Sequence, residues 1–400
     1  MRYVFVTDEL PRPGFAGHSA LKFAVLDWLR GLGHEVVVLL AGARLAAPVE
    51  RYVHGQVAGP LVWQSGHRLG VRSPKVAAEI AARALVRRLP ARLAGQVRWS
   101  RHGADTVLGG FISAADSAWC AAYVARYQPD AVLIDTMFRA RVLGEPELAG
   151  VNSVVIAHDV FHRRHLALTS AGYRVSPARL TREDEAAWLC GARHIAAIQP
   201  DEAAILAAMC PIQNVFLLQM PALPAPPPPG VARLPGRLVF VGSAALPNID
   251  GVRWFIDEVW PGLKGHGVTL DVLGDCGAAL PHLPSGITRL GRVENLATAL
   301  HRAALAIAPL RVGSGLKIKL LDYARHGLHS IATPPSLEGF AADAQAPFTA
   351  ASSAEAFAAA ILAHLDAPPG PARALDYVTR HYGVHASFAA LEKALGILSG

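Results

Sequence analysis

The chain contains 400 residues, 52% of them apolar, and carries a formal net charge of +7. This length exceeds what one hydrophobic core usually organises, so two α/β domains are expected. The four cysteines lie far apart and form no Cys-x-x-Cys pair, which argues against a zinc site or a disulfide framework and is compatible with the cytoplasm. No apolar run reaches the roughly 18 residues of a membrane-spanning helix. An apolar strand starts directly after Met1, so no signal peptide is expected.

The first half of the chain alternates short apolar runs with helical patterns. A strand over residues 2–6, a helix over 19–32 with Ser19 as N-cap, and a strand over 34–40 form a βαβ unit of the doubly wound type. The loop before the helix contains Gly14 and Gly17, but its spacing is looser than the Gly-x-Gly-x-x-Gly of dinucleotide-binding turns. Further buried strands are predicted over residues 131–134, 152–157, 194–198 and 215–218.

A polar cluster follows the strand predicted over residues 152–157. His158, Asp159 and Arg163 lie just past its end, and doubly wound sheets bind their ligands at the carboxyl ends of the strands. Most of the 17 histidines must have ordinary structural roles, so a structural hydrogen bond is the alternative for His158. The acidic run 183–185 heads a predicted helix, where acids stabilise the N-terminal dipole without any chemical role.

Residues 68–101 concentrate the positive charge of the chain. They contain nine Lys and Arg residues and one acid, Glu79. Apolar residues recur at helical spacing from Val76 to Val97, which predicts a basic amphipathic helical segment broken near Pro90. This segment is either a surface helix with a solvated face or a surface that binds anionic lipid or a lipid-diphosphate acceptor. No aromatic platform or nucleic-acid motif accompanies the basic residues, so no nucleic-acid partner is expected.

A proline-rich stretch divides the chain. Residues 221–236 include four consecutive prolines, which favour stiff polyproline and indicate an interdomain linker. We therefore predict domains over residues 1–220 and 237–380, with a C-terminal helix over 381–400.

The second domain also begins with a strand and a helix. A strand that starts at Arg237 ends at Gly242 and Ser243, whose backbone N–H groups are candidates for ligand contacts. The helix that follows, to about residue 260, contains Trp254 and Trp260, which we interpret as packing residues. Further strands are predicted over 268–273 and 287–290, the second leading into Gly291-Arg292-Val293.

One stretch of the second domain combines a strand, a glycine turn and a helix. Residues 303–309 form a predicted buried strand, Gly313-Ser314-Gly315 turns the chain, and Leu316 begins a helix that stops at Gly327. Such a turn directs unpaired backbone N–H groups and the positive end of a helix dipole at one place, where a phosphate is stabilised.

Charged side chains surround this turn. Arg311, Lys317 and Lys319 supply positive charge, and Asp322 on the helix can accept hydrogen bonds from the hydroxyls of a sugar. Together they suggest a nucleotide site, with the diphosphate at the turn and the ribose at the acid. The alternative is a tight turn between a strand and a helix with solvated lysines.

The stretch over residues 309–339 resembles the C-terminal signature of the retaining GT-B nucleotide-sugar glycosyltransferases of the "glycosyl transferases group 1" family. That signature is a glycine turn, two basic residues, two aliphatics, an acid, a small-residue helix, a glycine, an apolar strand, Thr-Pro and Glu-Gly. The matching residues are Gly313-Ser314-Gly315, Lys317, Lys319, Leu320-Leu321, Asp322, Gly327, residues 328–332, Thr333-Pro334 and Glu338-Gly339. The resemblance implies two doubly wound Rossmann-like domains that face each other across a cleft, with the last helix packing back on the first domain.

The resemblance also implies roles for individual residues. His158 would face the transferred sugar, and Lys317 and Lys319 would stabilise the leaving diphosphate. The glycine loop of the first domain, with Gly17 and His18, would lie over the reaction centre. Asp159 and Arg163 would shape the neighbouring loop or contact the acceptor. The nucleotide-sugar donor would be bound by Gly242, Ser243, Arg292, Val293, Arg311, Gly313, Ser314, Gly315, Leu316 and Asp322.

The implied reaction moves a sugar from a nucleoside diphosphate sugar to an acceptor hydroxyl with retention of configuration. No Asp-x-Asp metal motif occurs, so neither a metal nor a cofactor is expected. The implied acceptor is a glycan or a lipid-linked precursor of a bacterial surface polysaccharide or glycolipid, used in the cytoplasm or at the inner face of the cell membrane.

Two positions depart from the family pattern. Ser314 and Asp322 stand where many relatives have glutamates, which leaves recognition of the sugar and ribose hydroxyls open. The alternatives to a glycosyltransferase are a nucleotide-sugar epimerase of the same fold, which needs acids poised for proton transfer, and a non-catalytic nucleotide-sugar-binding subunit. A phosphorylase of this fold would need a pyridoxal lysine and a much longer chain.

Overall fold

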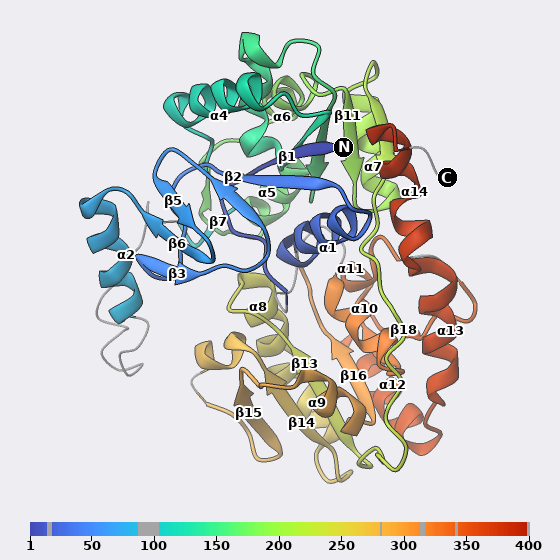
Figure 1. Cartoon of the computed structure of the whole chain (residues 1–400). Helices are drawn as coiled ribbons and strands as arrows, with labels where there is room; N and C mark the ends of the chain where they lie inside the picture. The colour runs from blue at the N-terminus through green and yellow to red at the C-terminus, as the bar shows by residue number, and fades with distance from the viewer. Residues whose placement is uncertain (14–17, 87–103, 281, 313–316, 341–342, 398–400) are drawn as a thin grey trace. The chain divides into compact units, whose positions relative to one another are not determined.

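The computed structural model describes residues 1–13, 18–86, 104–280, 282–312, 317–340 and 343–397. These residues form two compact units (Figure 1). The N-terminal unit comprises Met1–His165, Arg174–Leu218 and Ala389–Gly400, and the C-terminal unit comprises Leu166–Tyr173 and Gln219–Phe388. Among the described residues, no helix is both long enough and apolar enough to cross a membrane.

A seven-stranded parallel sheet, in the order β12-β11-β9-β8-β1-β2-β4, is the centre of the N-terminal unit. The strand order reverses between β1 and β8, which pair side by side. The strands are β1 (Arg2–Thr7), β2 (Glu35–Leu40), β4 (Gln56–Ala58), β8 (Ala131–Asp135), β9 (Ser153–Ala157), β11 (His194–Ala197) and β12 (Asn214–Leu217). The four central strands, β9, β8, β1 and β2, are fully or nearly fully buried apolar runs, as expected of a parallel sheet covered on both faces.

Helices cover this sheet, and their ends are fixed by local hydrogen bonds. Ser113 caps α4 by accepting the Asp116 N–H at 3.0 Å, and Thr181 forms a capping box with Asp184 at the start of α6. Along β1, Val4 and Val6 join a core with residues of α4, α6 and α7. The helices are α1 (His18–Gly31), α4 (Ala114–Tyr127), α5 (Phe161–Ser170), α6 (Arg182–Leu189) and α7 (Pro200–Met209), with 3₁₀ turns η2 (Met137–Gly144) and η3 (Pro146–Leu148) and a two-stranded sheet of β7 (Thr106–Val107) and β10 (Val175–Ser176).

The basic stretch over residues 68–101 is only partly a helix. Arg68–Val71 is strand β6, which pairs antiparallel with β3 (Val49–Arg51) and β5 (Val62–Ser65). These residues are therefore a strand and not part of the basic helical segment: Leu69 and Gly70 are buried, and Arg68 is exposed. Helix α2 (Pro74–Val86) follows, and Ile80 is its one buried residue. Residues 87–101 of the basic stretch lie outside the described residues.

The C-terminal unit has a six-stranded parallel sheet in the order β15-β14-β13-β16-β17-β18. If the strands are numbered 1 to 6 along the chain, their order across the sheet is 3-2-1-4-5-6, which is the order of the Rossmann fold. The order reverses between β13 and β16. The strands are β13 (Arg237–Val241), β14 (Thr269–Leu273), β15 (Ile287–Gly291), β16 (Leu305–Ala308), β17 (Ser330–Ala332) and β18 (Phe348–Ala350).

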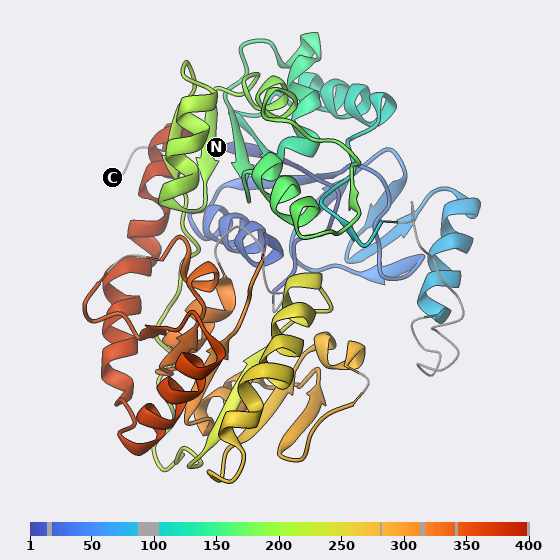
Figure 2. The ribbon, with the colours of Figure 1, turned by 180° about the vertical axis from the view of Figure 1, so that it is seen from behind.

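Helices pack on both faces of the second sheet because its strands alternate between two cores. Leu238 and Phe240 of β13 join a core with α8 and α12, while Val239 joins a second core with α9 and α10. Figure 2 shows α8, in yellow, lying over one face of this sheet. Trp254 and Trp260 are buried in the first core, as predicted. The helices are α8 (Leu246–Trp254), continued by a π-turn η4 (Phe255–Val259) and a 3₁₀ turn η5 (Trp260–Leu263), then η6 (Asp275–Ala279), α9 (Leu296–Arg302), α10 (Ile318–Arg325), α11 (Pro334–Leu337), α12 (Ala354–Asp366), α13 (Pro371–Tyr382) and α14 (Val384–Leu395).

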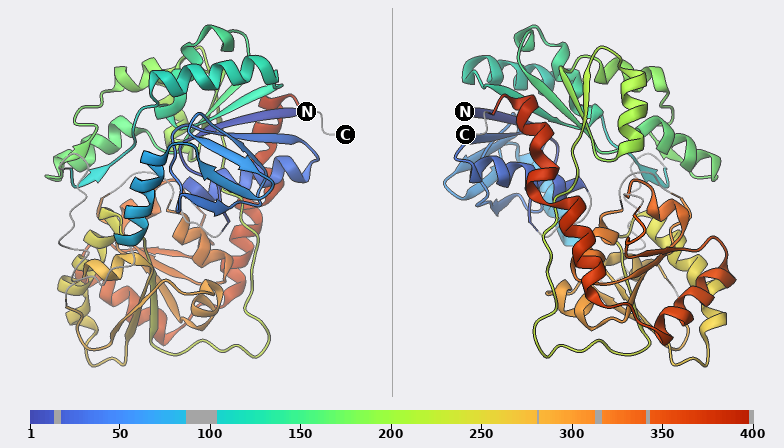
Figure 3. Two further views of the ribbon diagram at one scale, coloured as in Figure 1. Left: turned by 60° about the vertical axis from the view of Figure 1, so that its left-hand side comes forward. Right: turned by 90° about the vertical axis from the view of Figure 1, so that its right-hand side faces the viewer.

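The proline-rich stretch predicted as a linker is held along the C-terminal unit. Ala222 N–H donates to Tyr382 O at 2.8 Å, Ala225 N–H donates to Arg325 O at 2.6 Å, and Leu234 N–H donates to Arg302 O at 2.9 Å. Figure 3 shows this extended segment, in yellow-green, running along the unit. Its proline content fits this role, because an extended polyproline-like chain has no internal hydrogen bonds to lose.

Two stacked histidines contact Thr349 of β18 in the second sheet. The rings of His329 and His364 are parallel to within 23° with centroids 4.5 Å apart. Both Nε2 atoms face Thr349 Oγ1, at 2.8 and 3.1 Å. Burial, with His364 and Arg373 nearby, lowers the pKa of His329 to about 3. The folded protein therefore keeps this imidazole neutral at a pH where an unfolded chain protonates it.

We expect this histidine to make the C-terminal unit unstable to acid. Because the folded-state pKa of His329 lies below the unfolded value of about 6.5, its contribution is fully present above pH 6.5 and is lost by roughly 1.4 kcal/mol per pH unit as the pH falls. The urea concentration at the midpoint of unfolding should be lower at pH 5 than at pH 7.5. This decrease should be smaller in the His329→Gln variant. The exposed His385→Gln is the control; an equal acid dependence in His329→Gln and wild type would refute the assignment.

Candidate functional site

The carboxyl ends of β13 and β16 meet where the strand order of the C-terminal unit reverses. These two strands are hydrogen-bonded neighbours, and the crevice at such a reversal is where doubly wound sheets bind ligands. Gly242 and Ser243 follow β13, and the chain from Pro309 to Lys317 follows β16. The predicted phosphate-turn residues Gly313, Ser314, Gly315 and Leu316 lie outside the described residues.

The backbone that leads into this turn is fixed by two buried hydroxyls. Thr333 Oγ1 donates to Leu310 O, and Ser336 Oγ donates to Ala308 O at 2.6 Å while it accepts the Leu310 N–H at 3.2 Å. Both hydroxyl residues are buried. The Thr-Pro step of the sequence thus has a physical reason: it anchors the end of β16 just before the chain turns.

Lys319 on α10 is the central side chain of the site. Its Nζ donates to Asn248 Oδ1 at 2.5 Å and lies 4.2 Å from the centroid of the Phe240 ring. Burial lowers the pKa of Lys319 to about 7, with Lys317 adding to the decrease and Cys276 opposing it. Among the described residues, no carboxylate lies within ion-pair distance of Lys319. The site therefore holds a partly buried ammonium group that is available to pair with the negative charge of a bound ligand.

Gly242 provides the space in which Asn248 and Cys276 approach. A Cβ at this position would lie 2.7 Å from the Phe240 ring and 3.1 Å from both Asn248 Cγ and Cys276 Sγ. The Gly242 N–H donates to Leu273 O at 2.9 Å, so this amide is used by the fold and is not a phosphate donor, contrary to its predicted role. Ser243 instead orients Asn248, whose Nδ2 donates to Ser243 O at 3.1 Å and to its Oγ at 3.2 Å.

Two arginines predicted to bind the donor are paired with acids. Arg311 donates to both carboxylate oxygens of Asp250, from Nη2 at 2.7 Å and from Nε at 3.1 Å. The Nε of Arg292 lies 2.8 and 3.0 Å from the two carboxylate oxygens of Asp275. The side chain of Arg292 is 76% exposed, and Val293 beside it is also exposed. A bound phosphate would have to compete with these carboxylates, so neither arginine is a ready-made anion site.

Asp322, the predicted ribose ligand, lies on α10 near Arg325. The two charged groups are 3.7 Å apart, one helical turn along the same face. Burial raises the pKa of Asp322 to about 6, and Arg325 opposes the increase. The carboxylate is therefore ionised at neutral pH and able to accept hydrogen bonds from hydroxyls, as its predicted role requires.

A buried charge network occupies the reversal point of the N-terminal sheet. Asp135, at the end of β8, accepts hydrogen bonds at Oδ2 from Thr7 Oγ1 (2.7 Å) and Lys22 Nζ (3.0 Å), and its Oδ1 lies 3.0 Å from His158 Nε2. Lys22 also lies 3.6 Å from Glu9. Thr7 and Lys22 are completely buried, and Asp135 and His158 are 2% and 5% exposed. The predicted residue His158 is thus held by an acid that sequence reasoning did not single out.

The loop after His158 is held by two buried glutamates. Glu185 accepts the N–H groups of Phe161 at 2.9 Å and His162 at 2.8 Å, and Glu202 accepts the N–H of Val160 at 3.3 Å. These carboxylates are 1% and 4% exposed. They stabilise the first turn of α5, where a helix presents unpaired N–H groups. Glu185 therefore has a structural role different from the capping of its own helix that the sequence suggested.

The remaining predicted residues of the N-terminal unit have mixed placements. Asp159 is buried and forms an ion pair with Arg164, which raises the pKa of that guanidinium. Asp159 therefore shapes the loop, while Arg163 is exposed to solvent. His18 is the first residue of α1, and Gly17 lies outside the described residues.

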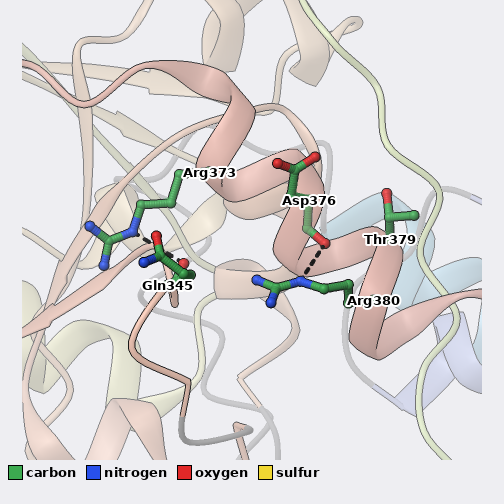
Figure 4. A pocket seen from close by; sticks show the side chains of 5 residues that line it. All are labelled: Gln345, Arg373, Asp376, Thr379 and Arg380. Carbon is green, nitrogen blue, oxygen red and sulfur yellow. Dashed lines mark hydrogen bonds between the residues drawn. The ribbon is translucent and has the colours of Figure 1, made fainter.

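A surface recess at α13 is a separate feature. Its accessible volume is about 540 Å³, and Figure 4 shows the five side chains that line it: Gln345, Arg373, Asp376, Thr379 and Arg380. Arg373 donates to the carbonyl groups of residues 344–346, and Arg380 pairs with Asp343 at 3.1 Å. Because both guanidinium groups already have partners, the recess is a poor anion site. Among the described residues, no cluster of three His, Cys, Asp or Glu side chains is suited to a metal.

Residues 235–367 match the family model described as "Glycosyl transferases group 1". The whole chain is similar to the solved structure of sucrose-phosphate synthase (tll1590) from Thermosynechococcus elongatus, with 15% identity, a TM-score of 0.66 and 100% of both chains covered. It is also similar to TarM, with 7% identity, a TM-score of 0.65 and 98% of both chains covered. The chain is similar as well to the solved structure of Anabaena Alr3699/HepE in complex with UDP, with 10% identity, a TM-score of 0.63 and 100% of both chains covered. Comparison with curated protein sequences gives no match.

The fold is GT-B. This confirms the fold class that the sequence predicted, with one Rossmann-like sheet in each unit. Each GT-B unit has a polar cluster at its own strand-order reversal: the Lys319 cluster in the C-terminal unit and the Asp135 network in the N-terminal unit. The sequence identified one member of each cluster by its place after a strand or turn. The partners Asn248, Lys22 and Asp135 carried no motif and became visible only through the fold.

Proposed function

We propose that this protein is a glycosyltransferase that moves a sugar from a nucleoside diphosphate sugar to an acceptor hydroxyl. The observation that carries the proposal is Lys319, an ammonium group without a carboxylate partner among the described residues, at the ligand-binding edge of a Rossmann-like sheet. The match of residues 235–367 to a glycosyltransferase family model supports it. Anabaena Alr3699/HepE, to which the chain is structurally similar, has been solved in complex with UDP and with UDP and glucose, so a UDP-sugar is the first donor to test.

In the proposed reaction, the bond between the anomeric carbon and the β-phosphate oxygen breaks and negative charge develops on the diphosphate. Lys319 and Lys317 would stabilise that charge, because positioned donors in a site of low polarity act more strongly than they do in water. Asp322 would bind the ribose hydroxyls, and His158 would face the transferred sugar. The departing phosphate would accept the proton of the acceptor hydroxyl, which is consistent with retention and requires no metal.

The proposed acceptor is a glycan or a lipid-linked precursor of a surface polysaccharide or glycolipid. Support comes from the basic composition of residues 68–101 and from the exposed helix α2 within it, which carries Lys75 and Arg83 and has Ile80 as its one buried residue. Binding to an anionic membrane through this stretch is part of the same proposal.

The proposal is tested by calorimetric titration with UDP, GDP, ADP, CMP and dTDP, without added metal. We expect saturable binding of one nucleoside diphosphate and no binding of CMP, because the site is proposed to bind a diphosphate. The matching nucleotide sugars should then release that diphosphate slowly to water and faster to a suitable acceptor. A nucleotide sugar that is epimerised without loss of its diphosphate would instead favour the epimerase, and binding without any turnover would favour a non-catalytic subunit.

His158→Ala is expected to lower turnover while the affinity for free nucleoside diphosphate stays within about twofold of wild type. The reason is that His158 belongs to the N-terminal unit, whereas the proposed phosphate ligands belong to the C-terminal unit. Calorimetry and the donor-release assay measure the two effects separately. An equal loss of nucleotide affinity would contradict this division of roles. The matched control is His162→Ala, which removes the neighbouring half-buried imidazole that contacts Glu185 at 2.8 Å.

A further inference from the structure

Two of the four cysteines are in direct contact in the N-terminal unit. Cys190 follows the last residue of α6 and Cys210 follows the last residue of α7. Their Sγ atoms are 2.6 Å apart, although 20 residues separate them along the chain. Cys210 is completely buried, and Cys190 is partly exposed. This pair could not be predicted from the sequence, because the spacing of the two cysteines fits no metal or redox motif.

The surroundings hold the two thiols in place. The Cys190 N–H donates to Ala186 O at 2.9 Å and its carbonyl accepts Gln213 Nε2 at 2.8 Å, while the Cys210 N–H donates to Leu206 O at 2.8 Å. Both backbones are thus fixed at the ends of helices. A disulfide has an S–S distance of about 2.05 Å, so the sulfurs need to approach by only about half an ångström.

We propose that Cys190 and Cys210 form an oxidisable thiol pair that closes to an intramolecular disulfide when the protein meets a peroxide. This inference concerns the N-terminal unit alone and does not depend on the proposed glycosyltransferase activity. The two cysteines were expected, from their separation in the sequence, to have no such relationship.

The chemistry follows from the unequal exposure of the two thiols. Cys190, the partly exposed one, attacks a peroxide oxygen as the thiolate and becomes a sulfenic acid, releasing hydroxide or water. Cys210 sulfur then attacks the sulfenic sulfur, the S–S bond forms, and the S–O bond breaks with release of water. Overall, two thiols lose two electrons and two protons, and one peroxide yields two waters. Burial and the neighbouring Cys190 raise the pKa of Cys210 to about 12, which suits it to the second step and not to the first.

The other two cysteines provide internal controls. Cys120 and Cys276 are both completely buried, and Cys276 belongs to the C-terminal unit. Burial raises the pKa of the Cys120 thiol to about 12 and also raises that of Cys276. Neither thiol contacts another cysteine among the described residues. We therefore expect both to stay reduced under conditions that oxidise the pair.

The test is mass spectrometry of the full chain after treatment with hydrogen peroxide and alkylation under denaturing conditions. The expected result is a loss of about 2 Da and two alkylated cysteines in place of four. Trypsin cleaves after Arg193, between the two cysteines, so peptides 183–193 and 194–233 should be joined before reduction and separate after it. The disulfide should also raise the melting temperature of the N-terminal unit by on the order of 5–10 °C, because it closes a loop in the unfolded chain.

Variants separate this pair from adventitious oxidation. Cys210→Ala should abolish the linked peptides and leave Cys190 as a sulfenic acid, trapped by dimedone, whereas Cys120→Ala should still form them. Four alkylated cysteines after peroxide treatment of the wild type would overturn the proposal. So would a disulfide that includes Cys120 or Cys276, or one that joins two chains. Because the measurement needs no substrate, a failure here is distinct from a failure of the proposed glycosyltransferase function.

Discussion

Lys319→Met is expected to lower turnover of the proposed transfer by about two orders of magnitude or more, because it removes a positive charge from the developing diphosphate. The affinity for the nucleoside diphosphate should fall in parallel. The fold should remain intact and become no less stable: burial disfavours the charged form of Lys319, whose pKa is lowered to about 7. A variant that loses binding while its melting temperature stays equal or rises would show that the lysine is retained for binding and not for stability.

The affinity of the wild type for the diphosphate should depend on pH above neutrality. In the free protein Lys319 begins to lose its proton near pH 7, whereas a bound diphosphate favours the charged form and raises its pKa. Binding then takes up a proton, so affinity should fall by up to tenfold per pH unit above about pH 7. The phosphate itself is fully ionised in this range, because its second pKa is near 6.

Lys319→Arg is the matched control for this pH dependence. A guanidinium stays protonated at every accessible pH, so the variant should bind with little change between pH 7 and pH 9. Lys319→Met should also show a flat profile, at much lower affinity. Calorimetry in two buffers of different ionisation enthalpy measures the proton uptake directly. No uptake by the wild type at pH 8 would refute the linkage, and normal turnover in Lys319→Met would refute the catalytic assignment.

Lys22→Met should destabilise the N-terminal unit by about 3–5 kcal/mol, because it leaves a buried carboxylate without its cation. Lys22 is completely buried and its Nζ lies 3.0 Å from the Asp135 carboxylate, which is 2% exposed. The Thr7 hydroxyl, which also binds Asp135, carries no charge and cannot replace the ammonium group. Hydrogen exchange of the backbone amides in β1 and β8, measured at increasing urea concentration, reports the decrease in the free energy of unfolding of this unit alone.

Two further variants show whether the effect comes from the charge pair. Adding Asp135→Asn to Lys22→Met removes the orphaned charge and should recover part of the lost stability. Arg83→Met breaks the exposed ion pair with Glu79, at 3.3 Å on α2, and should change stability by about 0.5 kcal/mol or less. If Lys22→Met resembled Arg83→Met, the buried pair would not contribute to the folded state.

Features that depend on neighbouring residues in the chain were predicted well. The buried apolar runs at residues 131–134 and 152–157 become β8 and β9, and Thr333-Pro334 anchors the strand before the turn. These patterns are local, since burial on both faces of a parallel strand requires a continuous apolar run. Doubly wound α/β domains could therefore be predicted from these patterns, whereas the GT-B fold was implied by the resemblance of residues 309–339 to a known family.

Features that depend on pairing across the chain could not be predicted. Arg311 and Lys22 meet their acids over separations of 61 and 113 residues, so the first was interpreted as a free cation and the second was not noticed. The strand at Arg68–Val71 was not predicted, because Arg68 was grouped with the basic residues of the helical pattern that starts at Val76, and its pairing with β3 and β5 leaves no motif in the sequence. Propensity gives little guidance where tertiary pairing decides the outcome.

The N-terminal unit is assembled from both ends of the chain, and this affects its biosynthesis. Its last segment, Ala389–Gly400, belongs to α14 and the residues after it, and Asn152 Nδ2 donates to Ala394 O at 3.0 Å. Leu391 and Leu395 of this helix are buried. At about 5–20 residues per second, a ribosome needs roughly ten to thirty seconds to make the intervening Gln219–Phe388. During this time the nascent unit lacks its closing helix, so its apolar docking surface is open to chaperones until translation finishes.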